Sequence, residues 1–302
     1  MSAVSFQEHP VPPGFAAGAP LPWWIKLGVK LAMGTLPVPP RAWRAVGLRR
    51  HSFSASESRR LVPPLQRAVA RANALLGRAP RSVLEIGPGA MVRRAPIAAA
   101  LGLGPILYLD VEDDAPHDLA PYRMAAEAAW AAGLTPPDLS GCATREDVLA
   151  ACGARLMLGG SDMLDRIPDG SFDLVFSEVV LEHVRRDAMA PLLRALRRVT
   201  APDGVGLHGV DFHDHLGGRL RQLGFSPGFW ESRAVDRAAL YNNRLGLSEM
   251  LEHFVGAGFE AEAPERLVWA APPLPARGIH PKLRRRAEDN RICQAQIEVR
   301  PV

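Results

Sequence analysis

Cysteine is scarce in this chain of 302 residues, which contains only Cys142, Cys152 and Cys293. Three scattered cysteines cannot build a disulfide framework, and none has the paired spacing of a zinc site. Such a chain suits a reducing compartment, so we expect a cytoplasmic protein.

Long uncharged apolar runs are also missing. Residues 21–38 are apolar, but Lys26 and Lys30 interrupt them before they reach the ~18 to 20 residues that a membrane span requires. No uninterrupted apolar stretch precedes a small-residue cleavage site. We therefore expect neither a transmembrane helix nor a signal peptide.

The net positive charge is small, because 36 Lys and Arg residues are nearly balanced by 32 Asp and Glu residues. No basic stripe is interleaved with aromatic residues, and the run 284–286 is best explained as a solvated helix face. We therefore expect no nucleic-acid partner. A hydrophobic content of 47% is enough to bury a large core, as one domain with an appendage.

The most informative pattern that is present is a short apolar strand that ends in glycines, over residues 82–90. Gly87 and Gly89 permit the positive φ of a sharp strand-to-helix turn and a close approach of backbone to a ligand. About twenty residues later, a second apolar strand ends at Asp110, where a doubly wound sheet presents a carboxylate to ribose hydroxyls. A glycine turn without a ligand is the alternative.

Several further segments, taken together with these two, resemble the class I S-adenosylmethionine-dependent methyltransferases. The resemblance covers about residues 80–210 and extends more distantly to bacterial small-molecule enzymes with Asp-His-Leu and Asn-Arg-Leu elements. The matching segments are Glu85-Ile86-Gly87-Pro88-Gly89, Asp110, Asp162-Met163, residues 168–177, Leu181-Glu182-His183, residues 198–204, Asp214-His215-Leu216 and Asn243-Arg244-Leu245.

This resemblance implies a cofactor site for S-adenosylmethionine and its product S-adenosylhomocysteine. By resemblance, the glycines lie beside the methionine part, Asp110 holds the ribose, and Asp162 with Met163 contacts adenine. Ser177 and Glu178 would line the methionine side. The full set of expected cofactor residues is Glu85, Gly87, Gly89, Asp110, Asp162, Met163, Ser177 and Glu178.

Methyl transfer from a sulfonium also requires an aligned acceptor and, often, a base. One candidate base is His215, oriented by Asp214 or Asp211, and another is His183 beside Glu182. A structural role for the pair at 182–183 is the alternative. A divalent metal on Asp211, His213 and His215 is possible but not favoured, because Glu178 and Glu182 are four residues apart, whereas metal-dependent RNA methyltransferases place two glutamates three apart.

Proline and periodicity divide the chain into a flexible lead over 1–22, an N-terminal helical region over 23–78, and the remaining residues 79–302. By resemblance, the helical region is expected to be a lid over the acceptor and 79–302 to be the class I methyltransferase domain. An insertion is expected at about 112–158. For the amphipathic helix near 23–33, an interfacial membrane contact is the alternative to a lid.

We therefore expect an α/β fold with a Rossmann-like, seven-stranded, mostly parallel sheet, helices on both faces and an N-terminal helical lid. The expected activity is methylation of a small molecule, with oxygen on a sugar or secondary metabolite favoured. N- or C-methylation of a natural product and a non-catalytic cofactor sensor are the alternatives. A homo-oligomer is compatible with the sequence, which does not specify one.

Overall fold

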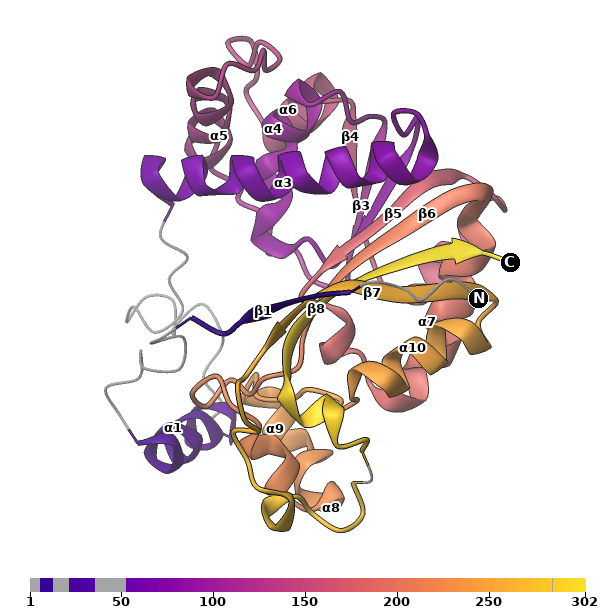
Figure 1. Cartoon of the computed structure of the whole chain (residues 1–302). Helices are drawn as coiled ribbons and strands as arrows, with labels where there is room; N and C mark the ends of the chain where they lie inside the picture. Colours follow the sequence, from indigo (N-terminus) through magenta and orange to yellow (C-terminus); the bar gives the residue numbers. More distant parts are fainter. Residues whose placement is uncertain (1–5, 13–21, 36–52, 284) are drawn as a thin grey trace.

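The computed structural model describes residues 6–12, 22–35, 53–283 and 285–302, and they form an eight-stranded sheet between two layers of helices (Figure 1). The strand order is β1-β7-β8-β6-β5-β2-β3-β4. The strands are β1 (Gln7–Pro10), β2 (Val83–Ile86), β3 (Ile106–Asp110), β4 (Ala154–Leu158), β5 (Phe172–Glu178), β6 (Thr200–Asp211), β7 (Phe259–Val268) and β8 (Ile292–Pro301). Only β8 runs antiparallel to its neighbours β6 and β7.

Two hydrophobic clusters place the helices on opposite faces of this sheet. One face carries α3 (Ala55–Leu76), α4 (Ala95–Ala100), α5 (Ala120–Ala131) and α6 (Arg145–Ala151). The other face carries α7 (Arg186–Val199) and α10 (Leu247–Gly256). The apolar residues of β2, β3 and β5 contribute to both clusters, which is why these central strands are almost continuously hydrophobic.

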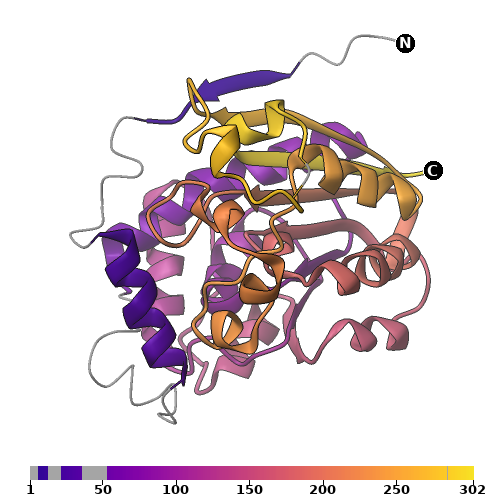
Figure 2. The ribbon, with the colours of Figure 1, turned by 90° about the horizontal axis from the view of Figure 1, so that it is seen from below.

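A smaller third cluster joins the N-terminal helix to a segment between β6 and α10. Residues 216–241, here the cap segment, contain α8 (Pro227–Trp230) and α9 (Arg233–Arg237). Leu27 and Leu31 of α1 (Trp23–Thr35) pack against the buried residues of this segment. Figure 2 shows α1 along one side of the cap segment, and Figure 1 shows it beside α9 and well below α3.

The fold differs from the sequence-based expectation in two strands. The sheet has eight strands rather than seven, because Gln7–Pro10, within the expected flexible lead, pairs in parallel with β7. All four residues of β1 are exposed, and Pro10 is tolerated because the strand lies at the sheet edge. At the other edge, the end of the expected insertion forms β4, so residues 112–158 are a crossover with helices that pack on α3 and α4.

Local signals account for the helix boundaries. Ser54 caps α3 through a reciprocal bond pair with Glu57, and Gly77 ends the helix with φ of 68°. Thr144 and Asp147 form the same capping arrangement at α6. None of the helices among the described residues is long and apolar enough to cross a membrane.

Candidate cofactor and acceptor site

A cavity of about 330 Å³ opens at the C-terminal ends of β2, β3 and β5. Neighbouring parallel strands end at the same sheet edge, which is where ligands bind in open α/β folds. Its lining includes Gly87, Asp110, Gly160, Val180 and His183. Three segments that the sequence singled out separately therefore meet around one space.

The two glycines of the first turn are required for different reasons. Gly87 has φ of 62°, and a Cβ atom there would lie 2.7 Å and 2.8 Å from the two methyl carbons of Val180. Gly89 has φ of 51°, but an added Cβ would meet no atom within 4 Å. Close packing against Val180 thus excludes a side chain at Gly87, whereas at Gly89 backbone conformation alone disfavours one.

Asp110 ties this turn to the second strand. Its Oδ2 accepts a hydrogen bond from the Gly89 backbone N–H at 2.7 Å, and its Oδ1 accepts one from the Glu112 N–H at 3.3 Å. A carboxylate offers about four lone-pair sites, so acceptor capacity remains for two ribose hydroxyls. The side chain is fixed at the cavity edge in a geometry that fits the expected role.

The expected adenine residues flank the cavity through the loop after β4. Gly159, Gly160 and Ser161 line the cavity, and Asp162 and Met163 follow directly in the 3₁₀ helix η2 (Ser161–Arg166). Asp162 is exposed, whereas Met163 is partly buried and packs against the core. A nucleoside base in this cavity would contact the backbone of Gly159 and Gly160 rather than the side chains of Asp162 and Met163.

Glu85 and Glu178 are held by one buried arginine. The Arg94 guanidinium, 7% exposed, contacts Glu85 Oε1 at 2.7 Å and Glu178 Oε2 at 3.0 Å. Burial alone would lower the Arg94 pKa, but the two carboxylates raise it above its ordinary value. The arginine fixes a half-exposed Glu178 carboxylate at the end of β5, while Glu85 is buried beneath the turn.

Sequence reasoning missed Arg94 because the Arg93-Arg94 pair has the composition of an ordinary surface turn. The structure buries it because η1 (Gly89–Arg94) turns the chain back under the end of β2. An acidic residue in a buried strand, such as Glu85, is the signal that a buried cation is required, since unpaired buried carboxylates are costly.

Ser177 lies on the opposite face of β5 from Glu178, because successive strand residues alternate. Its buried hydroxyl is 2.7 Å from Nδ1 of His208, whose ring packs against Phe254 of α10. Burial lowers the pKa of His208 to about 3, so this ring is neutral. The structure therefore places Ser177 in the α10 layer rather than in the cavity lining.

The two candidate bases form a stacked pair of imidazoles. The His183 and His215 ring centroids are 5.1 Å apart, with an interplanar angle of 12°. His183 Nδ1 lies 2.9 Å from the Tyr241 carbonyl oxygen; a carbonyl can only accept, so Nδ1 carries the proton and Nε2 is the acceptor. The His183 ring is therefore held by the cap segment through Tyr241, and the His215 ring stacks on it.

The pKa values of these two histidines differ. Burial lowers the pKa of His183 below its ordinary value, although the Tyr241 carbonyl and Asp211 act in the opposite direction. Burial, together with the positive charges of His183 and Lys30, lowers the pKa of His215 to about 4. Both imidazoles are therefore neutral near pH 7.

Asp214 does not orient His215. Its fully buried carboxylate accepts hydrogen bonds from the backbone N–H groups of Leu216 at 2.8 Å and Arg221 at 2.9 Å, which closes the loop into the cap segment. The structure thus gives this expected catalytic residue a place in the loop framework.

The histidine–carboxylate pair forms instead between His213 Nε2 and Asp211 Oδ2, 3.1 Å apart. The other oxygen of Asp211 accepts a bond from the Gln294 side chain at 2.6 Å. Burial would lower the pKa of His213, but Asp211 outweighs it and raises that pKa above its ordinary value.

Glu182 supports the loop rather than the neighbouring His183. Its Oε1 accepts the Asp211 backbone N–H at 3.2 Å, and its buried Oε2 has no partner among the described residues. Burial, aided by the Asp211 charge, raises the pKa of Glu182 to about 8. This carboxyl group is therefore protonated near pH 7.

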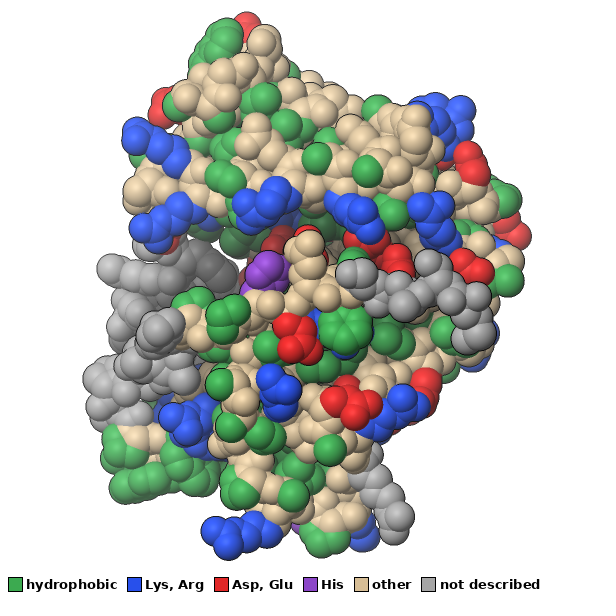
Figure 3. Space-filling view, viewed as in Figure 1, with side chains coloured by type: hydrophobic (Ala, Val, Ile, Leu, Met, Phe, Trp, Pro, Cys, Tyr) green, Lys and Arg blue, Asp and Glu red, His purple; other side chains and the backbone are tan. Residues whose placement is uncertain are grey.

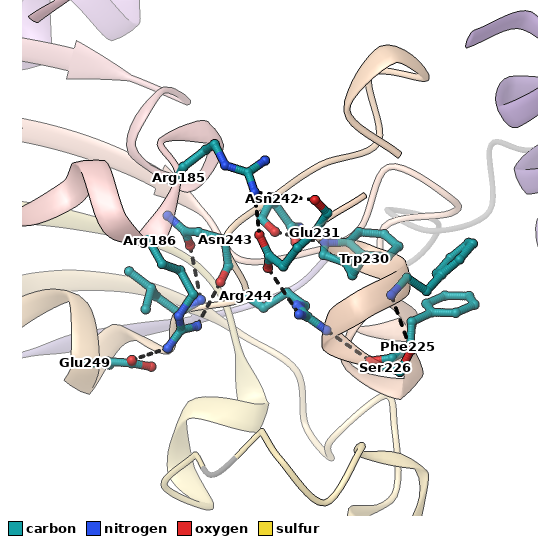
Figure 4. Close-up of polar contacts among 12 residues, drawn as sticks. Arg185, Arg186, Phe225, Ser226, Trp230, Glu231, Asn242, Asn243, Arg244 and Glu249 are labelled. Atoms are coloured by element: carbon teal, nitrogen blue, oxygen red, sulfur yellow. Dashed lines mark hydrogen bonds and ion pairs between the residues drawn. The ribbon is translucent and has the colours of Figure 1, made fainter. Parts of the chain in front are cut away.

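The Asn-Arg-Leu element braces the 3₁₀ helix η3 (Leu181–His183) against the cap segment (Figure 4). The Asn243 side-chain amide donates to the carbonyls of Leu181 at 2.7 Å and Val184 at 3.0 Å. Arg244 donates to the Phe225 carbonyl at 3.0 Å and to Glu231 at 3.2 Å. These hydrogen bonds position His183 relative to the cap segment. The sequence alone did not predict this role for Asn243 and Arg244.

The expected alternative of a metal on Asp211, His213 and His215 has no counterpart in the part of the chain that the structure describes. Within it, no group of three or more His, Cys, Asp or Glu side chains is arranged to hold a metal ion. The side chains of Asp211 and His213 bond to each other instead.

Comparison with known proteins gives one family match. Residues 137–207, from the loop before α6 to β6, match the model of the family described as a methyltransferase domain. No curated protein matches the sequence.

Several solved structures are similar to the chain. A S-adenosylmethionine dependent methyltransferase from Mesorhizobium loti is 18% identical, with a TM-score of 0.42, over 78% of this chain and 96% of that one. A TehB-like SAM-dependent methyltransferase from Corynebacterium glutamicum is 15% identical, with a TM-score of 0.38, over 87% and 95%. A Phospholethanolamine N-methyltransferase 2 of Haemonchus contortus, solved with S-adenosylhomocysteine, is 19% identical, with a TM-score of 0.36, over 61% and 35%. Sequence identities and TM-scores this low do not indicate which acceptor this chain uses or by which mechanism.

Proposed function

We propose that this S-adenosylmethionine-dependent methyltransferase transfers the methyl group to a hydroxyl oxygen of a small molecule, with His183 as general base. The observation that carries the proposal is the geometry of His183. It lines the cavity, its Nδ1–H is committed to the Tyr241 carbonyl, and its Nε2 is left as the acceptor.

The residues at the cavity fit the cofactor. The space that a Cβ atom would take at Gly87 is closed by Val180, so the turn backbone itself forms the wall. Asp110 supplies carboxylate acceptors for ribose hydroxyls, and the loop 159–161 supplies a slot for a base. The cofactor brings an electrophilic methyl group, and the protein must align the acceptor and remove its proton.

His183 suits proton removal better than His215 does, because His183 lines the cavity and its Nε2 is left as the acceptor. A hydroxyl loses its proton during attack on the methyl group, and a neutral imidazole can accept that proton near pH 7. His215 is not part of the cavity lining, and burial lowers its pKa to about 4, which makes it a weak base. We assign it to holding the His183 ring by stacking, 5.1 Å away.

A small acceptor is supported by the size of the cavity, about 330 Å³, and by its mostly apolar lining. Asp110, His183 and Arg185 are the titratable residues of that lining, and the Arg185 guanidinium lies 5.0 Å from the centre of the Tyr241 ring. A sugar or hydroxylated secondary metabolite matches a cavity with a few polar groups. The free cysteines, two of them buried, agree with a cytoplasmic location.

The test is release of S-adenosylhomocysteine in the presence of hydroxylated metabolites and sugars, with amines and carbon acids as parallel panels. Wild type should turn over a hydroxyl acceptor, His183→Gln should lose turnover but retain cofactor binding, and the exposed-site control His117→Gln should match wild type. Turnover only with amines or carbon acids would contradict O-methylation. Saturable cofactor binding without turnover on any panel would favour a sensor.

A further inference from the structure

The charged side chains of the N-terminal region are predominantly positive. Between Glu8 and Glu57 the sequence contains no acidic residue but six Lys and Arg residues, two of which, Lys26 and Lys30, lie in α1. A helix without acidic side chains in an acid-free segment is positively charged along its whole length. This distribution favours an anionic partner.

The outward arc of α1 is apolar. At about 100° per residue, Trp24, Ile25, Gly28, Val29 and Ala32 fall within an arc of about 140°. Trp24 is 61% exposed and Val29 is 48% exposed, although both are large apolar side chains. Figure 3 shows hydrophobic side chains gathered over α1 at the lower left of the molecule. This arc has no packing partner among the described residues that would bury it.

The side of α1 opposite the apolar arc packs against the cap segment, so the arc faces away from that segment. Leu27 and Leu31 pack into the cluster of the cap segment. A Cβ atom at Gly34 would lie 2.7 Å from the Ala238 backbone nitrogen, which shows how closely α1 approaches α9. Lys30 donates to the Ala239 carbonyl at 3.4 Å.

A basic residue borders the apolar arc. Lys26 lies about 60° beyond one edge of it, at the helix spacing of about 100° per residue. An apolar face with an exposed tryptophan and a flanking cation is the composition of a helix that lies in a membrane interface. A second copy of the chain would bring the same positive charges together across a symmetric contact, which is repulsive.

We propose that α1 docks the protein on an anionic phospholipid surface, with Trp24 and Val29 entering the headgroup region and Lys26 contacting lipid charge. The proposal is independent of methyl transfer, because it concerns the outer side of the cap segment.

The test is sedimentation of the full chain with vesicles of phosphatidylcholine, with and without phosphatidylserine. Wild type should bind the vesicles that contain phosphatidylserine, and added salt should weaken binding. Lys26→Glu should weaken binding roughly thirtyfold, since one basic residue near an anionic surface contributes about 1 kcal/mol and a charge reversal about twice that. Trp24→Ser should weaken binding roughly tenfold, because it removes the largest exposed apolar side chain of the arc. Melting temperatures should stay at the wild-type value.

The matched control is Trp130→Ser, because Trp130 is 64% exposed but lies on α5 in another layer. It should bind vesicles like wild type. Equal binding by wild type and Trp24→Ser, or no binding of wild type to anionic vesicles, would overturn the proposal. A dimer in gel filtration that Trp24→Ser dissolves, without vesicle binding, would assign the arc to self-association instead.

Discussion

Replacement of Gly87 by alanine tests the packing of the cofactor turn against the loop after β5. The added Cβ would lie 2.7 Å and 2.8 Å from the Val180 methyl carbons, and φ at this position is 62°. A left-handed conformation costs an L-residue about 1–2 kcal/mol, and overpacking costs about 1–3 kcal/mol more. The total destabilisation should therefore be about 2–5 kcal/mol.

Gly89→Ala is the matched control, since φ is also positive there but the space is open. It should cost only the conformational part, about 1–2 kcal/mol. In a thermal melt, where 1 kcal/mol corresponds to about 2–4 °C for a domain of this size, Gly87→Ala should lower the Tm by roughly 4–20 °C and Gly89→Ala by roughly 2–8 °C.

A double-mutant cycle then isolates the contact itself. Val180→Ala removes both methyl groups that the new Cβ would meet, so Gly87→Ala should cost less in that background by about 1–3 kcal/mol. The same Val180→Ala change should leave the cost of Gly89→Ala unaltered. Equal losses for the two glycine variants, or strict additivity of Gly87→Ala with Val180→Ala, would refute the packing argument.

Three further substitutions have defined outcomes. His183→Gln should reduce kcat roughly 100-fold to 10,000-fold while calorimetry finds cofactor affinity nearly unchanged; an unaltered kcat would remove the proposed base. Because burial raises the Glu182 pKa to about 8, the stability that this group contributes is fully present below pH 4.5 and is lost as the pH rises toward 8. Glu182→Gln should therefore have a higher melting temperature than wild type at pH 8 but not at pH 4. The same difference in melting temperature at both pH values would contradict this prediction. Asn243→Ala removes the hydrogen-bond donors of the Leu181 and Val184 carbonyls, at a cost of about 1–3 kcal/mol each, so the melting temperature should fall by about 2–4 °C per kcal/mol. A melting temperature within about 1–2 °C of wild type would contradict the role of Asn243 as a brace.

β2, β3 and the glycine turn after β2 could be predicted because their signals are local. Continuous apolar residues, two glycines and a carboxylate at the strand end place Gly87 and Asp110 at one edge, and the cavity lies there. The segment after β3 was predicted as an insertion at about 112–158. The edge strand β1 was not, since four exposed residues with a terminal proline carry no periodic pattern.

Side-chain partners were harder to predict, because they depend on which face of a strand or loop each residue occupies. Adjacency in the sequence suggested Asp214 for His215, whereas the bend after β6 brings His213 to Asp211 at 3.1 Å. Within β5, alternation separates Ser177 from Glu178. Arg94 and Asn243 act through tertiary contacts with distant segments, and although Glu85 signals a buried cation, nothing local shows that Arg94 supplies it.

Calorimetric titration of S-adenosylmethionine into the purified protein is the most direct test that the cavity holds the methyl donor. We predict saturable binding by wild type and by Asp114→Ala, which removes a nearby exposed carboxylate. Asp110→Asn, which keeps an oxygen for the Gly89 N–H but loses the carboxylate charge, should weaken binding while preserving the fold. Absence of binding by folded wild type, or equal affinity in Asp110→Asn, would contradict the account.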